Sequence, residues 1–289
     1  MKIKILEPFG YCAGVDRAIN MAFKIKKEHP HQKVVVLGML VHNEDALDAL
    51  SKAGIETIYD PNLSLIDLID KVDSKSFVIL TAHGHAKEVE DKLNRRHIEF
   101  VDATCPFVTL TFNRIKKAVS TNQDVLYLGK KNHPEANAAL SISDKVHLIE
   151  PKTVQIQAKY KNPLVISQTT FSEAEIAIAI CEIQKQIKDA EVVESICNAS
   201  TLRQSALKNL SNDVELIYVV GGKNSNNTKT LFEIATQSHP KAKVRLIQNA
   251  DDINKKDLLG LNYVAISSGA STPKEVTLSI KSAIEALLN

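Results

Sequence analysis

The sequence has no apolar run that approaches the length of a membrane-spanning helix, and its basic residues form no stripe. The 36 basic and 34 acidic residues leave a net charge of +2, and basic pairs such as Arg95-Arg96 and Lys130-Lys131 are scattered. These absences argue against a membrane protein and against nucleic acid as a partner. The first residues alternate apolar and charged side chains like a strand rather than a signal peptide, so we expect a cytoplasmic location.

Several common site motifs are also missing. The chain has no C-x2-C pair of the kind that holds structural zinc, and no H-E-x-x-H metal motif. It has neither the G-x-x-x-x-G-K-[ST] phosphate loop nor the G-x-G-x-x-G fingerprint, which disfavours bound ATP or nicotinamide. No linker rich in Pro, Gly or Ser divides the 289 residues, so we expect their parts to pack closely around one centre.

What the sequence does contain is an alternation of β-rich apolar runs and amphipathic helical patterns. Continuous runs such as Val34–Leu37 are typical of strands buried on both faces of a parallel sheet. The alternation predicts an α/β protein built from right-handed βαβ units. The predicted strands are Lys2–Leu6, Val34–Leu37, Phe77–Thr81, Ile98–Asp102, Asp124–Leu128, Leu164–Ser167, Glu191–Ile196, Glu215–Val220, Lys243–Ile247 and Tyr263–Ser267.

Three of the four cysteines, Cys12, Cys105 and Cys197, recur at almost equal intervals. Each lies where a strand pattern gives way to a helical one. The spacing predicts three pseudo-repeated α/β lobes with mostly parallel sheets, although the thirds share negligible sequence identity. The lobes are residues 13–104, residues 105–196, and residues 197–289 together with 1–12.

A helix N-terminus favours the thiolate, which is the form of cysteine that binds metal. Three thiolates that meet at one centre fit a [4Fe–4S] cluster with one open iron better than they fit structural zinc. The alternative is three unrelated buried cysteines. We interpret the fourth, Cys181, as a small core residue beside the apolar face of its helix, Ile176–Ile187.

Six predicted strands end in small polar residues or histidine, two in each third. Ligands bind at the carboxyl ends of parallel strands, and this donor-rich set suits phosphate or diphosphate. Its one carboxylate, Glu135, either relays protons or favours the N-terminus of the following helix. The six segments are Leu40–Asn43, Thr81–Gly84, Asn132–Glu135, Gln168–Thr170, Lys223–Asn227 and Ser267–Ser271.

Taken together, these segments resemble the 4-hydroxy-3-methylbut-2-enyl diphosphate reductase family, whose reaction is the last step of the non-mevalonate isoprenoid pathway. The matches follow the family order along the whole chain. They are Gly10–Val15, Val41–Asn43, Ala82–Gly84, Asp102–Pro106, His133–Glu135, Gln168–Thr170, Ile196–Ala199 with Arg203-Gln204, Val220-Gly221 with Lys223–Ser225 and Asn227, and Gly269–Ser271 with Pro273.

The resemblance implies a central iron–sulfur cluster held by Cys12, Cys105 and Cys197, with one open iron. It implies that an allylic diphosphate undergoes two-electron reductive dehydroxylation to isopentenyl and dimethylallyl diphosphates. Electrons are expected from a ferredoxin- or flavodoxin-like donor. Glu135, Thr169 and His133 are the expected catalytic residues. The residues expected to bind the diphosphate are His42, His83, His133, Ser225, Asn226, Asn227 and Ser271.

Two residues depart from the family pattern: His85 stands where a small or apolar residue is more usual, and Asn226 where many relatives have Ser. From this sequence we do not expect the C-terminal RNA-binding extension of some relatives. Three alternatives stay open. They are a non-redox iron–sulfur lyase or synthase resembling quinolinate synthase, a zinc-stabilised binding protein, and a metal-free phosphosugar-binding protein.

Overall fold

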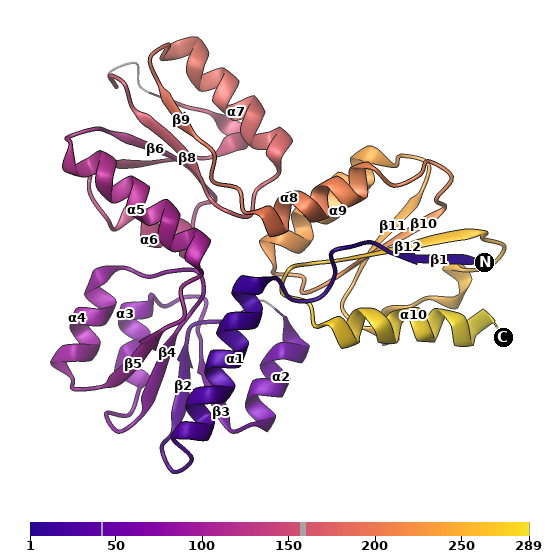
Figure 1. Cartoon of the computed structure of the whole chain (residues 1–289), viewed down its shortest axis with the longest axis horizontal. Helices are drawn as coiled ribbons and strands as arrows, with labels where there is room; N and C mark the ends of the chain where they lie inside the picture. The colour runs from indigo at the N-terminus through magenta and orange to yellow at the C-terminus, as the bar shows by residue number, and fades with distance from the viewer. Residues whose placement is uncertain (42, 157–159, 289) are drawn as a thin grey trace. The chain divides into compact units, whose positions relative to one another are not determined.

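The computed structural model describes residues 1–41, 43–156 and 160–288. Its strands form three four-stranded sheets, each with its own helices, and every strand pairing is parallel (Figure 1). The predicted class, three α/β lobes with parallel sheets, is confirmed.

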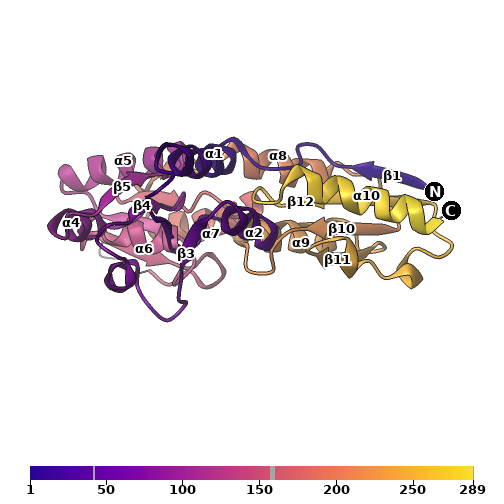
Figure 2. The same ribbon diagram turned by 90° about the horizontal axis from the view of Figure 1, so that it is seen from below.

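The first sheet joins the N-terminal strand to the C-terminal third of the chain. Its central strand β10 sends alternate side chains to opposite faces, as a strand must. Ile217 and Val219 pack with α8 and α9, whereas Tyr218 and Val220 pack with α10, which lies beside β12 in Figures 1 and 2. The strand order is β1 (Lys2–Ile5), β12 (Tyr263–Ser268), β10 (Leu216–Val220) and β11 (Lys243–Ile247). The helices are α8 (Asn198–Lys208), α9 (Asn226–Ser238), α10 (Lys274–Leu288), η3 (Ala250–Asp252) and η4 (Lys255–Asp257).

The second sheet contains the continuous apolar run of β2, which is buried throughout. One of its faces, through Leu37 and Leu80, packs against Leu68 and Leu93 of the helices α3 and α4. The strand order is β3 (Ile55–Ile58), β2 (Val34–Leu37), β4 (Phe77–Leu80) and β5 (Glu99–Asp102). The helices that precede or connect these strands are α1 (Ala13–Glu28), α2 (Glu44–Lys52), α3 (Leu65–Leu68), η1 (Ile69–Lys71) and α4 (Lys87–Arg95).

The third sheet is also covered on both faces. Tyr127 packs on the side of α5 and α6, whereas Leu126 and Leu128 pack on the side of α7. The strand order is β7 (Val146–Ile149), β6 (Val125–Leu128), β8 (Leu164–Ser167) and β9 (Glu191–Val193). The helices are α5 (Pro106–Ser120), α6 (Pro134–Leu140), η2 (Pro151–Thr153) and α7 (Glu173–Gln186).

Two strands, β3 and β7, are absent from the sequence prediction. Both are edge strands, and both carry polar residues: Glu56 and Thr57 in β3, and His147 in β7. An edge strand needs less continuous burial than a central one, so its apolar signal is weaker. The ten predicted strands are all present, most with ends that differ by one to three residues.

The topology separates two kinds of loop. The six polar strand ends follow β2, β4, β6, β8, β10 and β12, which are the two central strands of each sheet. The loops of Cys12, Cys105 and Cys197 instead follow β1, β5 and β9, an edge strand of each sheet. The cysteines therefore lie where the chain leaves one sheet for the next.

By its packing, the chain falls into two compact units. The first is Met1–Asp16, Val41–Asp48 and Cys197–Asn289, and the second is Arg17–Leu40 and Ala49–Ile196. The three lobe boundaries given by the cysteines therefore stay a prediction. Among the described residues, no helix combines the length and apolarity that crossing a lipid bilayer requires.

Two isoleucines of the second unit give a matched test of the core. Ile79 in β4 is fully buried, whereas Ile178 on α7 is 64% exposed. We expect Ile79→Ala to lower the free energy of unfolding by about 2–5 kcal/mol, because it removes buried methyl groups and leaves a cavity. Ile178→Ala should have a much smaller effect. Urea unfolding measures both, and equal losses would contradict this packing.

Candidate active site

The most deeply buried carboxylate of the site is Glu135, in the first turn of α6. Its side chain is 1% exposed and accepts three hydrogen bonds. The backbone N–H of Thr169 donates to Oε1 at 2.9 Å, and its hydroxyl donates to Oε2 at 2.9 Å. The Tyr127 hydroxyl donates to Oε1 at 3.1 Å. The loops after β6 and β8 thus meet at one acid, and the predicted neighbours Glu135 and Thr169 lie in direct contact.

Burial controls the ionisation of this acid. It raises the pKa of Glu135 to about 7, although the hydrogen bonds from Thr169 and Tyr127 act in the opposite direction. Loss of hydration therefore outweighs the three donors. A carboxyl group with a pKa near neutrality is matched to donating a proton at physiological pH. In its neutral form, its O–H can donate to Thr169 Oγ1, which reverses that hydrogen bond.

His133 and His83 lie next to this acid. His133 caps the N-terminus of α6, and its Nδ1 accepts the backbone N–H of Glu135 at 3.2 Å. In the neutral ring this bond assigns the proton to Nε2, where it can be donated to an anion. The His133 and His83 rings meet edge to face, with their centroids 5.7 Å apart. Two of the predicted diphosphate-binding histidines are therefore adjacent.

The conformation of the loop that carries His83 depends on Gly84. Gly84 has a φ of +81°, and a Cβ atom there would lie 2.4 Å from the ring of Phe112 in α5. Glycine is needed both for the backbone angle and for this close approach. The backbone N–H of Cys105 donates to Ala82 O at 3.0 Å. The His83 loop is thus held against the start of α5, where Cys105 lies.

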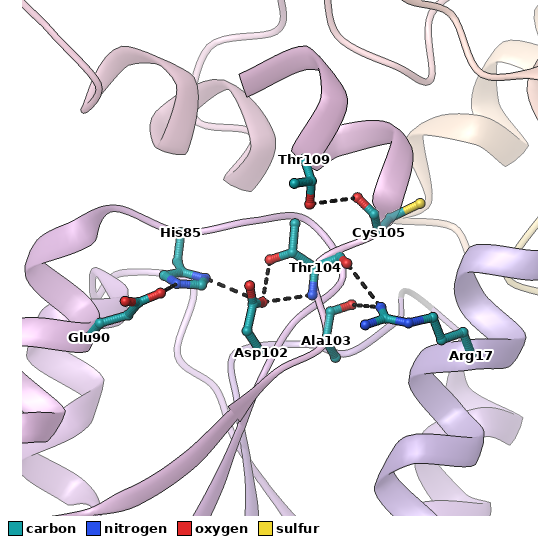
Figure 3. A network of polar contacts seen from close by, with 8 residues as sticks. All are labelled: Arg17, His85, Glu90, Asp102, Ala103, Thr104, Cys105 and Thr109. Atoms are coloured by element: carbon teal, nitrogen blue, oxygen red, sulfur yellow. Dashed lines mark hydrogen bonds and ion pairs between the residues drawn. The ribbon is translucent and has the colours of Figure 1, made fainter. Parts of the chain in front are cut away.

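Cys105 occupies the N-cap position of α5 and precedes Pro106, so its sulfur lies near the positive end of the helix. Figure 3 shows the turn that leads to it. The Asp102 carboxylate accepts the backbone N–H and the hydroxyl of Thr104, at 2.8 and 2.5 Å. Arg17 donates to the carbonyl oxygens of Ala103 and Thr104. These contacts fix the backbone directly before the cysteine.

The departure at position 85 contributes to the same network. The buried ring of His85 lies between two carboxylates, with Nε2 2.9 Å from Glu90 Oε1 and Nδ1 3.9 Å from Asp102 Oδ1 (Figure 3). Among the described residues these three form a possible cation-binding group. Because the two carboxylates face different ring nitrogens, the ring acts as a link between them rather than as one corner of a metal site.

In the first unit, Cys12 and Cys197 lie in one hydrogen-bonded chain. The backbone N–H of Cys12 donates to Ala270 O at 2.9 Å. The N–H of Ala270 donates to Asn227 Oδ1, and Asn227 Nδ2 donates to Ser200 Oγ at 3.2 Å. Ser200 Oγ lies 3.2 Å from Cys197 Sγ. Since Asn227 donates to the Ser200 oxygen, the Ser200 hydroxyl hydrogen can point to sulfur, which suits a thiolate.

The other predicted anion-binding residues lie around this chain. Ser225 caps α9 and accepts the backbone N–H of Thr228, and Asn226 is the first residue of that helix. Ser271 is buried, and within the described part of the chain its hydroxyl has no hydrogen-bond partner. A buried hydroxyl without a partner is suited to a ligand. His42 lies outside the described residues.

The interpretation of Cys181 as a core residue is wrong, because its side chain is exposed on α7. The buried residues of this helix include Ile176, Ala179 and Ile183. At 100° per residue, position 181 lies about 140° or more around the helix from each of them. The apolar run placed Cys181 near the buried face, but the helical repeat directs it to solvent.

The sequence analysis did not predict Tyr127 and Arg203 as residues of the site. Tyr127 is a buried residue of β6, and its hydroxyl is the one polar side-chain group of an otherwise apolar strand, so it needs a buried partner. Arg203 is 3% exposed in the middle of α8. The sequence signal that could have identified Arg203 as a site residue is its position six residues after Cys197, a predicted metal ligand.

Comparison with known proteins assigns the family. A sequence model described as "LytB protein" matches residues 3–285. The chain belongs to the LytB family. Its LytB relatives include the 4-hydroxy-3-methylbut-2-enyl diphosphate reductases of Bacillus cereus (strain AH820) and Bacillus thuringiensis (strain Al Hakam). Over 294 residues they are 37% and 36% identical to it, covering 99% of this chain and 90% of each relative.

Solved LytB-like structures agree over the full length. The Plasmodium falciparum E-1-hydroxy-2-methyl-but-2-enyl-4-diphosphate reductase matches with a TM-score of 0.87 and 25% identity, covering 99% of this chain and 88% of that one. A structure of (E)-4-hydroxy-3-methyl-but-2-enyl diphosphate reductase, described as the terminal enzyme of the non-mevalonate pathway, matches with a TM-score of 0.69 and 28% identity. It covers 99% of this chain and 100% of that one. The family resemblance given by the sequence motifs is confirmed.

The raised pKa of Glu135 predicts a specific pH dependence of stability. The folded chain keeps this proton up to about pH 7, whereas the unfolded chain releases it near 4.5. This proton's contribution to the free energy of unfolding is therefore fully present below pH 4.5. It is lost as pH rises towards 7, in total about 3 kcal/mol. Glu135→Gln should remove this loss. Between pH 4.5 and 7 the free energy of unfolding of the variant should therefore increase relative to that of the wild type.

Urea unfolding at several pH values between 4.5 and 8 measures the difference. The exposed Glu88 gives the matched control, and Glu88→Gln should follow the wild-type curve. Parallel curves for the wild type and Glu135→Gln would show that Glu135 ionises like an exposed carboxyl group.

Proposed function

We propose that this chain reduces 4-hydroxy-3-methylbut-2-enyl diphosphate to isopentenyl and dimethylallyl diphosphates. In this reaction the allylic C–O bond breaks, a C–H bond forms, and two electrons and two protons enter as water leaves. The observation that carries the proposal is the full-length match to reductases of this name at 36–37% identity. The buried acid with a pKa near neutrality supports it, because the reaction consumes protons.

The chemistry of the three cysteines fits an iron–sulfur cluster. Within the described residues Cys12, Cys105 and Cys197 form no disulfide, and each lies at or directly before the N-terminus of a helix. The backbone N–H of Val15 points to Cys12 Sγ at 3.5 Å. Amides and hydroxyls directed at sulfur stabilise thiolate ligands. When bound to these three residues, a [4Fe–4S] cluster supplies single electrons and one open iron as a Lewis acid.

We assign the substrate diphosphate to the set of donors that the sequence predicts. His83 and His133 can present ring N–H groups, and Ser225, Asn226, Asn227 and Ser271 lie at or near the start of α9 and in the loop before α10. We retain His42 in this set. The amide of Asn227 already bonds to Ser200 and Ala270, so its first role is to hold the loop that presents Ser271. Fixed donors of this kind bind a diphosphate and orient the attached chain.

Protons reach the substrate hydroxyl from Glu135 through Thr169. The neutral acid donates to Thr169 Oγ1, and that hydroxyl passes its own proton on to the leaving oxygen. The backbone N–H of Thr169 holds Glu135 Oε1 in place at 2.9 Å while the other oxygen carries the proton. His133 caps the same turn through its Nδ1, and so orients the acid and the diphosphate together.

The remaining assignments follow from the reaction. Two single electrons require a one-electron protein donor, and we assign a ferredoxin- or flavodoxin-like protein in the cytoplasm. We also retain the three lobes 13–104, 105–196 and 197–289 with 1–12 as the structural repeats. A lyase or synthase with the same cluster would need no external electrons, and a zinc protein or a metal-free phosphosugar-binding protein would be colourless.

Anaerobically purified protein tests the proposal. We expect a brown protein with about four irons per chain. It should oxidise reduced methyl viologen only when 4-hydroxy-3-methylbut-2-enyl diphosphate is added. Cys105→Ser should lose cluster iron and activity together, because a hydroxyl is a poor replacement for a thiolate ligand. The exposed Cys181 is the control, and Cys181→Ser should keep both.

Brown protein without substrate-dependent oxidation would favour the lyase alternative. Colourless protein that contains zinc would exclude both enzymes. Full iron content in Cys105→Ser would remove this residue from the ligands.

The proton path gives a second test. Glu135→Gln should keep its iron but lower turnover by about 10²–10⁴-fold, the usual contribution of a general acid. At position 169, Thr169→Val should also slow turnover, whereas Thr169→Ser keeps the hydroxyl and should retain most of it. Both position-169 variants keep the backbone bond to Glu135. Near-normal turnover of Glu135→Gln, or equal rates for the two position-169 variants, would exclude this path.

A further inference from the structure

Arg203 is a buried cation placed between the loops of two cysteines. Its guanidinium donates to Ser268 O at 3.2 Å, to Ala199 O at 3.0 Å and to Gly10 O at 2.6 Å. Gly10 lies two residues before Cys12, and Ala199 lies two residues after Cys197. One side chain thus connects the two backbone segments that carry Cys12 and Cys197.

The charge of this side chain lacks the usual counter-ion. Arg203 is 3% exposed, and its three acceptors are neutral carbonyl oxygens. Within the described ranges, no aspartate or glutamate forms an ion pair with it. A buried charge without an opposite charge is strongly unfavourable, so an anion is expected nearby.

The two sulfurs supply that anion. Burial lowers the pKa of Arg203, and negative charge on Cys12 and on Cys197 opposes this effect. Both sulfurs therefore lie close enough to act on the guanidinium. The Ser200 hydroxyl and the N–H of Val15, at 3.2 and 3.5 Å, already favour negative charge on the same atoms. Because Arg203 is buried, water screens its attraction to these anions less than it would at the surface.

We propose that Arg203 is the fixed counter-charge of the thiolate centre and sets its affinity for electrons. The inference rests on the proposed function, because it assigns Arg203 to the cluster held by Cys12 and Cys197. Each electron that enters such a cluster adds one negative charge. A buried positive charge stabilises the reduced state more than the oxidised state, and so raises the reduction potential.

A purely structural role is the alternative, in which the three hydrogen bonds hold the loops and the charge is incidental. The two roles separate when charge and geometry are changed independently. Lysine keeps the charge but cannot reproduce the planar guanidinium with its fixed donors. Glutamine keeps polar donors without the charge, and methionine keeps only the length of the side chain.

The experiment is a reductive titration of the anaerobically purified enzyme, followed by its visible and electron paramagnetic resonance spectra. In Arg203→Met and Arg203→Gln, the redox equilibrium between reduced methyl viologen and the cluster should shift about tenfold towards the oxidised cluster. For a one-electron couple this is about 59 mV more negative. Arg203→Lys should stay close to the wild type, although it loses part of the hydrogen bonding. The comparison of Lys with Gln suffices if Arg203→Met does not fold.

Arg245 in β11, a strand of the sheet against which α8 packs, provides a matched control. It is half exposed and pairs with Asp257 at 2.9 Å, so Arg245→Met should leave the potential unchanged. Equal potentials in Arg203→Gln and the wild type would overturn the proposal. So would a shift in Arg203→Lys as large as that in Arg203→Gln, because it would assign the effect to geometry.

A second measurement keeps the inference separate from the proposed reaction. Brown protein that does not reduce the diphosphate still allows the titration. If the wild type holds no cluster, Co²⁺ alone serves as the probe, through its thiolate charge-transfer absorption. Arg203→Gln should then bind Co²⁺ about tenfold more weakly, and Arg203→Lys about as tightly as the wild type. Equal Co²⁺ affinities, or no Co²⁺ binding at all, would overturn the proposal.

Discussion

The parallel pairing of all three sheets is the constraint on which the candidate site depends. Because neighbouring strands run in the same direction, the loops at their carboxyl ends all leave from the same end of each sheet. The two central strands of each sheet are covered on both faces, which makes their ends rigid points of attachment. The loops after β6 and β8 bring Glu135 and Thr169 together in this way, and those after β10 and β12 bring together Asn227 and Ala270.

The cysteines use a different part of the same architecture. Each follows an edge strand and lies directly before the helix that starts the next lobe, so its loop is also a connection between lobes. Such a connection has fewer strand neighbours than a central loop and needs other contacts to fix it. Those contacts are Arg17 and Asp102 beside Cys105, and Arg203 beside Cys12 and Cys197. Charged side chains thus replace sheet neighbours where the metal ligands are expected.

Much of this organisation could be read from the sequence, because burial in a parallel sheet leaves a strong signal. The continuous run Val34–Leu37 is a central strand and was predicted without error, whereas the edge strands β3 and β7 were missed. The thiols and polar strand ends could be found because their spacing repeats. What the sequence does not contain is the partner of a polar group, such as Tyr127 for Glu135, since such pairs form only on folding.

Cys181 shows the same limit at a smaller scale. Its neighbours in the chain are apolar, and composition alone placed it near the core. The direction of its side chain depends on the helical repeat relative to Ile176, Ala179 and Ile183, and the structure places it in solvent. The spacing of the other three cysteines is informative because each lies in the same context, after a strand and directly before a helix.

Glu135 and Arg203 finally show how one physical effect gives two kinds of group. Burial disfavours the charge of both, and nearly all the water around each has been removed. Among the described residues Glu135 meets three hydrogen-bond donors and no cation, so it keeps its proton up to about pH 7 and can donate it. Arg203 cannot lose its proton at any ordinary pH, so the protein must keep negative charge near it. Burial therefore makes the acid a source of protons, and it makes the base a permanent charge that depends on the two sulfurs.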